Sequence, residues 1–396
     1  MMKSTHPLHI SLVTETYPPE VNGVAMTLGK LVAGLTARGH RLRIVRPRQK
    51  NENTGLQSDG QLLTPGLPIP GYPELRFGLP AANSLWQHWR KQTPDVVHIA
   101  TEGPLGFSAL SAARKLGIPA ISTFHTNFHS YSRHYGIGWL QGSIARYLRW
   151  FHNRTATTLV PTASLAAELQ QYGFHDVGVL SRGVDVQLFN PGRRDPGLRS
   201  EWGAREQDLV VMVVSRVAPE KNLGLAIEAY ERILANQPTA RMVCVGDGPI
   251  REALMRRHPE VRFVGTKHDV ELARHYASAD LFLFPSLTET FGNVVSEALA
   301  SGLPVVAFDY AAASSLIKNG INGQRIERGD NAGFIAAAVA LARDLPNHPR
   351  WRNAGPASIA HLNWERALDS YETALRDKAL MEQYWPEERY LLLLPD

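Results

Sequence analysis

Short apolar runs alternate with helical patterns along the chain, and this alternation limits the possible folds more than any other feature. Residues 8–13 are mainly apolar and lead into a loop rich in Pro and Gly. Val24, Leu28 and Leu31 then recur at helical spacing, and the next apolar run covers residues 41–45. Consecutive strands that are joined through helices run parallel. The pattern therefore predicts an α/β fold with a doubly wound parallel sheet, which binds ligands at the carboxyl ends of its strands.

The second half of the chain repeats this pattern. Its apolar runs cover residues 209–214, 240–245, 261–264, 281–284 and 304–308. Between the halves, residues 189–197 consist mainly of turn formers and are the predicted linker. A chain of 396 residues is also long for one domain. We therefore predict two Rossmann-like domains that face a cleft, residues 1–189 and 190–360, followed by a helical segment over residues 361–396.

Composition limits the classes of protein. Hydrophobic residues make up 44% of the chain and charged residues 20%, which is typical of a globular protein. No apolar run reaches the length of about 18 residues that a spanning helix needs. Residues 1–7 do not resemble a signal peptide. We expect a cytoplasmic protein, either free or bound peripherally to the inner face of the plasma membrane. The single cysteine, Cys244, lies in an apolar run and is expected to fill a buried strand.

Charge is distributed unevenly between the halves. Residues 1–189 contain 18 Lys and Arg against 10 Asp and Glu, whereas residues 190–396 contain 24 against 27. The basic half fits an anionic partner, such as a membrane surface or an acidic acceptor, or it is simply a solvated face. Within it, residues 138–154 mix aromatic with basic side chains, including Arg146, Arg149 and Trp150. Such a helix either lies on an anionic bilayer or packs its aromatic side chains into the core.

Two carboxylates flank a glycine turn in the second half. Glu289 precedes Phe291–Gly292–Asn293, which should open a helix after the predicted strand at residues 281–284, and Glu297 lies inside that helix. A helix N-terminus attracts phosphate, and carboxylates accept hydrogen bonds from sugar hydroxyls. The combination favours a nucleotide sugar as ligand. The alternative is that both glutamates are exposed surface residues.

This stretch resembles the Glu-x7-Glu signature of the retaining glycosyltransferases of family 4. The resemblance implies that Glu289 contacts the transferred hexose and that Glu297 holds the ribose. Phe291, Gly292, Asn293 and Val294 would line the donor with backbone donors to sugar and phosphate. It also implies a GT-B fold, in which the C-terminal helix around residues 364–375 crosses back to the first domain.

Two cations follow an apolar strand at the start of the second half. Arg216 and Lys221 should lie at the carboxyl end of that strand, where they are able to neutralise a diphosphate leaving group or are merely exposed loop charges. Their spacing is similar to the Arg-x4-Lys phosphate clamp of family 4. In the same domain, Gly246 ends a further strand, and Thr266 and Lys267 belong to a loop that resembles the one whose backbone reads the base.

The first half holds further candidates. His125 follows an apolar strand and matches the family's cleft histidine, which implies a hydrogen bond to the transferred sugar. Asn22 and Gly23 occupy the first turn, where the family's loop approaches donor phosphate and acceptor, although glycine in such a turn often serves geometry alone. Ser181–Asp185 resembles the family's sequence before the linker, so Arg182 and Asp185 either border the cleft or fix the linker.

Three segments resemble one branch of the family in particular. Tyr17–Gly23, Glu102–Gly106 and Phe124–Phe128 look most like the bacterial GDP-mannose-dependent mannosyltransferases and the plant sulfoquinovosyltransferases, whose acceptors are often glycolipids. One departure is Tyr310–Ser314, which replaces the Gly-Gly-x-Pro-Glu turn of many relatives. No Asp-x-Asp motif and no His/Cys cluster with metal spacing occurs in the sequence, so we expect neither a metal nor another cofactor.

The predicted reaction is retaining transfer of a hexose from a GDP- or UDP-sugar to an acceptor hydroxyl. The expected partners are a nucleotide sugar and a lipid or glycan acceptor, without nucleic acid. Two alternatives stay open: a GT-B-like epimerase acting on UDP-N-acetylglucosamine, and a non-catalytic protein that binds sugar nucleotides. Sequence alone does not choose the base, the hexose or the acceptor, because loop backbone and pocket shape select them.

Overall fold

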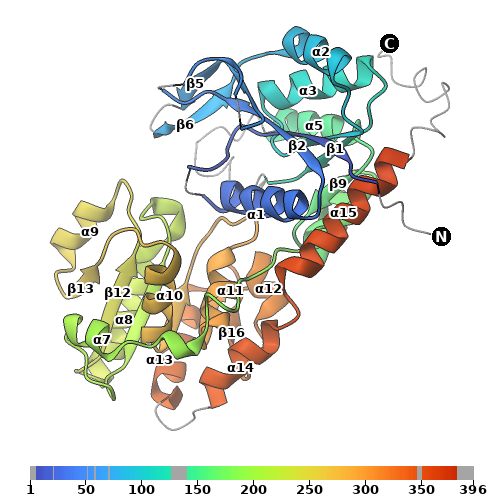
Figure 1. The fold of residues 1–396 in the computed structure, drawn as a ribbon. Helices are drawn as coiled ribbons and strands as arrows, with labels where there is room; N and C mark the ends of the chain where they lie inside the picture. Colours follow the sequence, from blue (N-terminus) through green and yellow to red (C-terminus); the bar gives the residue numbers. More distant parts are fainter. Residues whose placement is uncertain are drawn as a thin grey trace. The chain divides into compact units, whose positions relative to one another are not determined.

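The computed structural model describes residues 6–20, 22–50, 52–57, 59–69, 72–125, 141–345 and 350–380. Contacts divide them into two compact units (Figure 1). The first contains the described residues up to 125, residues 141–181 and residues 365–380, and the second contains the described residues between 182 and 364. The division falls before residue 182 instead of after residue 189. The reason is that Val184 and Phe189 are buried in the core of the second unit.

The first unit is built on a largely parallel sheet of eight strands in the order β10-β9-β8-β7-β1-β2-β4-β3. Its strands are β1 (His9–Val13), β2 (Arg41–Pro47), β3 (Gly55–Leu56), β4 (Gln61–Thr64), β7 (Val96–Ile99), β8 (Ala120–Thr123), β9 (Thr158–Val160) and β10 (Val177–Val179). A separate hairpin consists of β5 (Gly66–Ile69) and β6 (Tyr72–Gly78). The predicted strands at residues 8–13 and 41–45 are confirmed as the adjacent parallel pair β1 and β2. Strands β3 to β6, β9 and β10 were not predicted from the sequence; all of them except β6 have four residues or fewer.

Helices cover both faces of this sheet (Figure 1). They are α1 (Gly23–Ala37), α2 (Ala82–Lys91), α3 (Pro104–Lys115), α5 (Gln141–His152) and α6 (Ala163–Gln171). The last described helix, α15 (Trp364–Leu380), packs on α1 so closely that a Cβ added at Gly34 would lie 2.3 Å from a methyl of Leu368. Its buried Tyr371 places a hydroxyl 2.5 Å from Nδ1 of His98 on β7. These contacts explain why residues 365–380 group with the first unit despite their position in the sequence.

The second unit contains a fully parallel sheet in the order β13-β12-β11-β14-β15-β16. Its strands are β11 (Val210–Val214), β12 (Arg241–Val245), β13 (Val261–Phe263), β14 (Leu281–Phe284), β15 (Val305–Phe308) and β16 (Gly323–Ile326). The five predicted runs therefore all form strands, and β16 is added. The strand order reverses between β11 and β14. In open α/β sheets, such a reversal opens a crevice at the carboxyl ends of the two strands.

Both faces of the second sheet are buried. Along β11, Val210, Met212 and Val214 belong to one core, whereas Val211 and Val213 belong to the other. The covering helices are α7 (Pro196–Glu201), α8 (Leu223–Asn236), α9 (Arg251–Arg257), α10 (Asp269–Ser278), α11 (Asn293–Ala300), α12 (Ala311–Leu316), α13 (Asn331–Asp344) and α14 (Arg350–Ile359), with short 3-10 turns η2 (Pro191–Arg193) and η3 (Pro219–Lys221). Cys244 is buried in β12, as predicted, and burial raises the pKa of its thiol to about 12.

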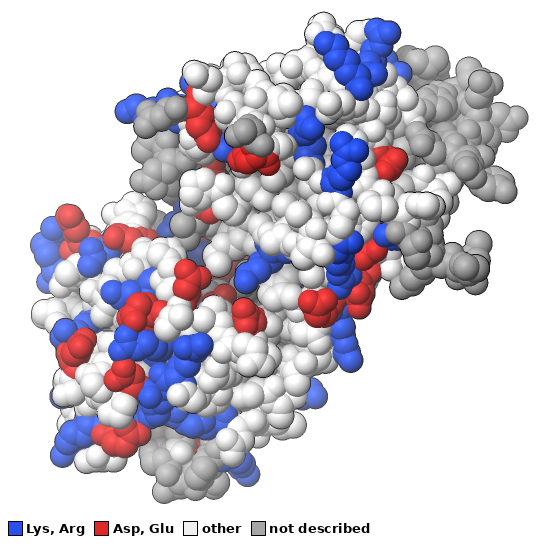
Figure 2. All heavy atoms as spheres, viewed as in Figure 1, with Lys and Arg blue, Asp and Glu red and all other residues white. Residues whose placement is uncertain are grey.

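Charged side chains of the second unit are interspersed on the face drawn in Figure 2. The described residues of that face include a group of adjoining Lys and Arg with Asp and Glu around it. Every described helix of the chain is either too short or too polar to span a membrane.

Candidate functional site

The glycine turn lies between β14 and α11, at the carboxyl edge of the second sheet. Gly292 has φ 89° and ψ 64°, a left-handed conformation that favours glycine, and it caps α11. Phe291 is 3% exposed and anchors the turn in the core, while its carbonyl accepts a hydrogen bond from the Ala312 backbone (2.8 Å). The turn is therefore fixed by the burial of Phe291 and by this hydrogen bond, and α11 begins directly after it at Asn293.

Glu289 and Lys221 contact each other directly beside this turn. Glu289 Oε1 lies 2.5 Å from Lys221 Nζ and accepts a hydrogen bond from Ser286 Oγ (2.8 Å). Lys221 Nζ also donates to the Thr288 carbonyl (3.1 Å). Only 16% of the lysine side chain and 15% of the glutamate side chain are exposed. The predicted hexose-binding acid and the predicted phosphate-binding cation therefore belong to one site.

The backbone brings their two segments together. The Leu287 N–H donates to the Glu220 carbonyl (3.0 Å), which ties the loop after β14 to the turn η3. Arg216, the other predicted cation, is exposed and forms an ion pair with Glu220. A bound diphosphate would have to compete with Glu220 for the Arg216 guanidinium. This pairing with Glu220 was not predicted from the sequence.

Glu297 lies one turn into α11 and is partly buried. Its Oε2 accepts a hydrogen bond from the Tyr276 hydroxyl (3.0 Å). Burial raises the pKa of Glu297 to about 7, although the hydrogen bond from Tyr276 opposes the shift. The raised pKa favours the protonated carboxyl group, which is able both to accept and to donate hydrogen bonds.

Arg182 is a buried cation behind the turn. Its Nη1 donates to Asn293 Oδ1 (3.1 Å), and its guanidinium lies 5.5 Å from the centre of the Phe291 ring. Burial lowers the pKa of Arg182 to about 10, while the negative charge of Glu289 opposes the shift. From the sequence, Arg182 was expected only to border the cleft or to fix the linker. Its resemblance to the family's pre-linker sequence was the one signal that pointed to it.

Tyr310 supports the loop that carries Glu289. Its hydroxyl donates to the Ser286 carbonyl (2.7 Å), and Arg328 stacks over its ring while donating to the Leu287 carbonyl (2.5 Å). Burial and the nearby charge of Glu289 raise the pKa of Tyr310. Tyr310 belongs to the segment that departs from the family pattern, Tyr310–Ser314. It contacts the loop that carries Glu289, although no role was predicted for it.

Gly246 and the loop after β13 lie at the same edge of the sheet. A Cβ at Gly246 would lie 1.9 Å from the Ser215 carbonyl oxygen, so only glycine fits this close approach. Its N–H donates to the Gly265 carbonyl (2.9 Å). Thr266 is exposed and Lys267 is partly buried. A role of these residues in holding the nucleotide remains a prediction.

In the first unit, the predicted residues lie at or after the carboxyl ends of strands. Asn22 caps α1 by accepting hydrogen bonds from the Val24 and Ala25 N–H groups, so it has a structural role whatever else it does. Gly23 is the first residue of α1 and does not have a left-handed φ. His125 follows β8 and is partly buried, while the rest of its motif, residues 126–128, lies outside the described residues.

Two acids at this edge were not predicted as site residues. Burial raises the pKa of both Glu15 and Glu102 to about 7, and the charge of Glu15 adds to the shift at Glu102. The Glu15 carboxylate accepts a hydrogen bond from the Leu105 N–H (3.3 Å), and the Glu102 carbonyl accepts one from the Tyr147 hydroxyl (2.6 Å). Glu15 thus caps the first turn of α3, which is a sufficient structural reason for its burial.

The basic aromatic segment divides between surface and core. Trp150 on α5 is 39% exposed and stacks on Phe107, which is 45% exposed, with ring centres 5.7 Å apart. Arg146 and Arg149 hydrogen-bond to nearby carbonyls, at Gly142 and Tyr172. Phe151 of the same segment is fully buried and packs inward. Trp139 lies outside the described residues. The core-packing alternative therefore holds for part of the helix, and contact with a bilayer stays a prediction.

The site combines features of the glycosyltransferases that use sugar nucleotides. These features are a glycine-capped helix at the edge of a parallel sheet, an acid paired with a lysine, and a second acid on the helix. Comparison with known proteins identifies the family. The profile of Glycosyltransferase Family 4 matches residues 21–188, and that of Glycosyl transferases group 1 matches residues 208–344. The chain belongs to glycosyltransferase family 4, which confirms the resemblance noted in the sequence.

Several of the relatives belong to the predicted branch of mannosyltransferases and sulfoquinovosyltransferases, and others lie outside it. The GDP-mannose-dependent α-mannosyltransferase of Mycobacterium tuberculosis is 32% identical over 91% of this chain and 94% of its own. The sulfoquinovosyl transferase of Arabidopsis thaliana is 29% identical over 83% of this chain and 65% of its own. The α-monoglucosyldiacylglycerol synthase of Streptococcus pneumoniae is 28% identical over 86% of this chain and 80% of its own.

Solved structures confirm the GT-B fold. Anabaena HepE in complex with UDP-glucose is similar with a TM-score of 0.73 and 17% identity, covering 93% of this chain and 100% of that chain. Sucrose-phosphate synthase of Thermosynechococcus elongatus has a TM-score of 0.75 and 16% identity, covering 93% and 98%.

Proposed function

We propose that the protein is a retaining hexosyltransferase that moves a hexose from a nucleotide diphosphate sugar to a hydroxyl group of a membrane lipid or glycolipid. GDP-mannose is the first donor to test, because the mannosyltransferases among the relatives are named for it. UDP-glucose is the second, since solved structures of the same fold bind UDP and glucose.

The observation that carries the proposal is the contact of Glu289 with Lys221 beside the Gly292 turn. A sugar diphosphate needs both a cation for the phosphate and an acceptor for the sugar hydroxyls, within the length of one ligand. The pair supplies both, and the N-terminus of α11 adds backbone donors. On binding, Lys221 would be shared between Glu289 and the β-phosphate.

The remaining residues take roles around this pair. Glu289 orients the hexose, Arg216 and Lys221 stabilise the departing diphosphate, and Glu297 holds the ribose hydroxyls. His125 hydrogen-bonds to the transferred sugar. Charge stabilisation of the leaving group is usually the largest catalytic contribution in such a site.

The reaction would proceed on one face of the sugar. The bond from the anomeric carbon to the diphosphate breaks as the bond to the acceptor oxygen forms, and a diphosphate oxygen takes the acceptor's proton. The cations replace a metal in this scheme. We therefore expect EDTA to leave the transfer rate unchanged; a loss that Mg²⁺ restores would contradict it.

The proposed contact with a lipid acceptor involves the exposed surface of α5. Trp150 and Phe107 form an exposed aromatic pair, and Arg154 lies over the Trp150 ring at 4.2 Å. Exposed aromatics flanked by arginines suit the headgroup region of an anionic bilayer. Trp150→Ala should weaken sedimentation with phosphatidylglycerol vesicles while the donor KM stays unchanged. Equal binding by both proteins would remove the membrane part of the proposal.

The function is tested in two stages. A thermal-shift panel of GDP-mannose, UDP-glucose, UDP-galactose and UDP-glucuronic acid should single out one donor, because a ligand that binds the native state raises Tm. Transfer from that donor to a diacylglycerol glycolipid is then followed by mass spectrometry, and NMR of the product reports the anomeric configuration. Inversion of configuration would refute the retaining mechanism.

Donor alone distinguishes the alternatives. An isomerised sugar nucleotide formed without acceptor would indicate an epimerase. A donor that binds but undergoes neither transfer nor hydrolysis, whatever acceptor is offered, would indicate a binding protein.

A further inference from the structure

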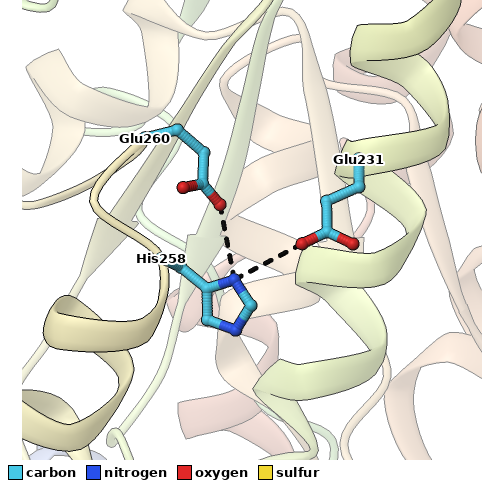
Figure 3. A group of neighbouring side chains, drawn as sticks. All are labelled: Glu231, His258 and Glu260. Atoms are coloured by element: carbon cyan, nitrogen blue, oxygen red, sulfur yellow. Dashed lines mark ion pairs between the residues drawn. The ribbon is translucent and has the colours of Figure 1, made fainter.

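A histidine and two glutamates converge at the other edge of the second sheet, away from the donor site. His258 ends α9, Glu260 immediately precedes β13, and Glu231 lies on α8. Figure 3 shows both carboxylates turned toward the same ring nitrogen of His258. Because all strands of this sheet are parallel, the start of β13 lies at the amino edge, opposite the turn that follows β14. The cluster therefore plays no part in holding the donor.

The distances within the cluster fit a shared cation. His258 Nδ1 lies 3.4 Å from Glu231 Oε1 and 3.3 Å from Glu260 Oε1. Both separations are longer than the roughly 2.7–2.9 Å of a charge-assisted hydrogen bond. A tetrahedral ion with metal–ligand distances of about 2.0–2.1 Å keeps its ligand atoms about 3.3–3.4 Å apart. The three ligand atoms all lie within 4.8 Å of one another, and the glutamates are exposed enough to close the third separation.

The backbone around the cluster is well anchored. The His258 N–H donates to the Leu254 carbonyl (2.8 Å), and the Val261 N–H donates to the His258 carbonyl (3.1 Å). On α8, the neighbours of Glu231 include the buried Tyr230, which fixes that part of the helix. Three ligands are thus presented by two rigid segments, and an ion among them would join α8 to the turn between α9 and β13.

We propose that His258, Glu231 and Glu260 form a structural binding site for a zinc-class divalent cation. An imidazole nitrogen with two carboxylates suits Zn²⁺, Co²⁺ or Ni²⁺ better than Mg²⁺ or Ca²⁺, which prefer oxygen ligands. The two negative charges balance the ion, and three protein ligands leave the fourth position to water. The ion stabilises the folded second unit and does not enter the transfer reaction.

The test uses the full-length protein without a histidine tag, treated with chelator and then dialysed. Calorimetric titration with ZnCl₂ should reveal one stoichiometric site, and Zn²⁺ should raise Tm. His258→Ala should lower that affinity at least tenfold, whereas His361→Ala, which removes an exposed histidine elsewhere in the second unit, should not change it. Glu231→Gln should also lower it, and this near-isosteric change carries the test if His258→Ala fails to fold.

Three results would overturn the proposal: no stoichiometric Zn²⁺ site in the wild type, equal affinity in the His258 and His361 variants, or Mg²⁺ binding the cluster as tightly as Zn²⁺. The first two would leave the cluster as a contact between His258 and two glutamates without a bound ion. Zn²⁺ titration requires neither donor nor acceptor, so its outcome is independent of the proposed transferase activity.

Discussion

Replacing Glu289 with glutamine tests the donor site most directly. The substitution keeps the shape of the side chain and one oxygen that is able to accept from Ser286, but it removes the charge that pairs with Lys221 at 2.5 Å. Lys221 retains its hydrogen bond to the Thr288 carbonyl. Because both side chains are only about one-sixth exposed, we expect a loss of stability of about 1–2 kcal/mol, which leaves the protein folded.

The loss of activity should be larger than the loss of stability implies. A hydrogen bond from a hexose hydroxyl to a carboxylate is worth about 1.5–3 kcal/mol, and its loss in the transition state corresponds to a fall of about 10- to 150-fold in kcat/KM. Glu289→Ala, which also removes the remaining acceptor oxygen, should abolish measurable transfer.

The assay is transfer from the donor selected by thermal shift, with Tm and circular dichroism as folding controls. Glu228→Gln is the matched control, because Glu228 is an exposed glutamate on α8. It should leave kcat/KM within twofold of the wild type. A Glu289→Gln protein whose kcat/KM also stays within twofold would refute the assignment of Glu289 to the hexose.

Three further predictions concern the same unit. Gly292→Ala should cost about 1–2 kcal/mol in urea unfolding, because the left-handed backbone strains alanine although the nearest side-chain atom is 3.5 Å away. The pKa of Glu297 is raised from 4.5 to about 7, so the folded state retains a proton that the unfolded state releases, and stability falls as pH rises through that range. Glu297→Gln should lessen this slope of the unfolding free energy between pH 4.5 and 7, to which Glu15 and Glu102 also contribute, and an unaltered slope would contradict the shift. Arg182→Met should raise the donor KM at least tenfold with a smaller effect on kcat. Arg182→Lys should recover only part of the lost donor affinity, since lysine keeps the charge but loses the planar contact with Phe291. Full activity of the Met variant would show that the buried cation serves the linker alone.

Local pattern predicted the fold well and the partners of site residues poorly. Periodicity identified the strand at residues 281–284 with its correct bounds, since every one of its side chains is buried and apolar. It did not identify the short strands β3 to β6, or the boundary at residue 182. That boundary depends on contacts such as the Val184 N–H to the Leu362 carbonyl (2.9 Å), between residues far apart in the sequence.

The same contrast holds within the site. Glu289, Gly292 and Glu297 are recognisable in the sequence because they lie within one short stretch, whose spacing follows from the geometry of a single turn and helix. The ion pair of Glu289 with Lys221 joins residues 68 positions apart. The hydrogen bond of Arg182 to Asn293 joins residues 111 positions apart. Neither pairing leaves a periodic signal.

The amino-acid sequence by itself determined the alternating strands and helices, the glycine turn and the residue types at the carboxyl edge of the second sheet. Tertiary structure alone decided which charges far apart in the sequence meet: Lys221 with Glu289 in the proposed donor site, and His258 with Glu231 at the opposite edge. The physical reason is range. Backbone conformation and burial periodicity act between near neighbours in the chain, whereas pairing of side chains depends on how separate elements pack around the core.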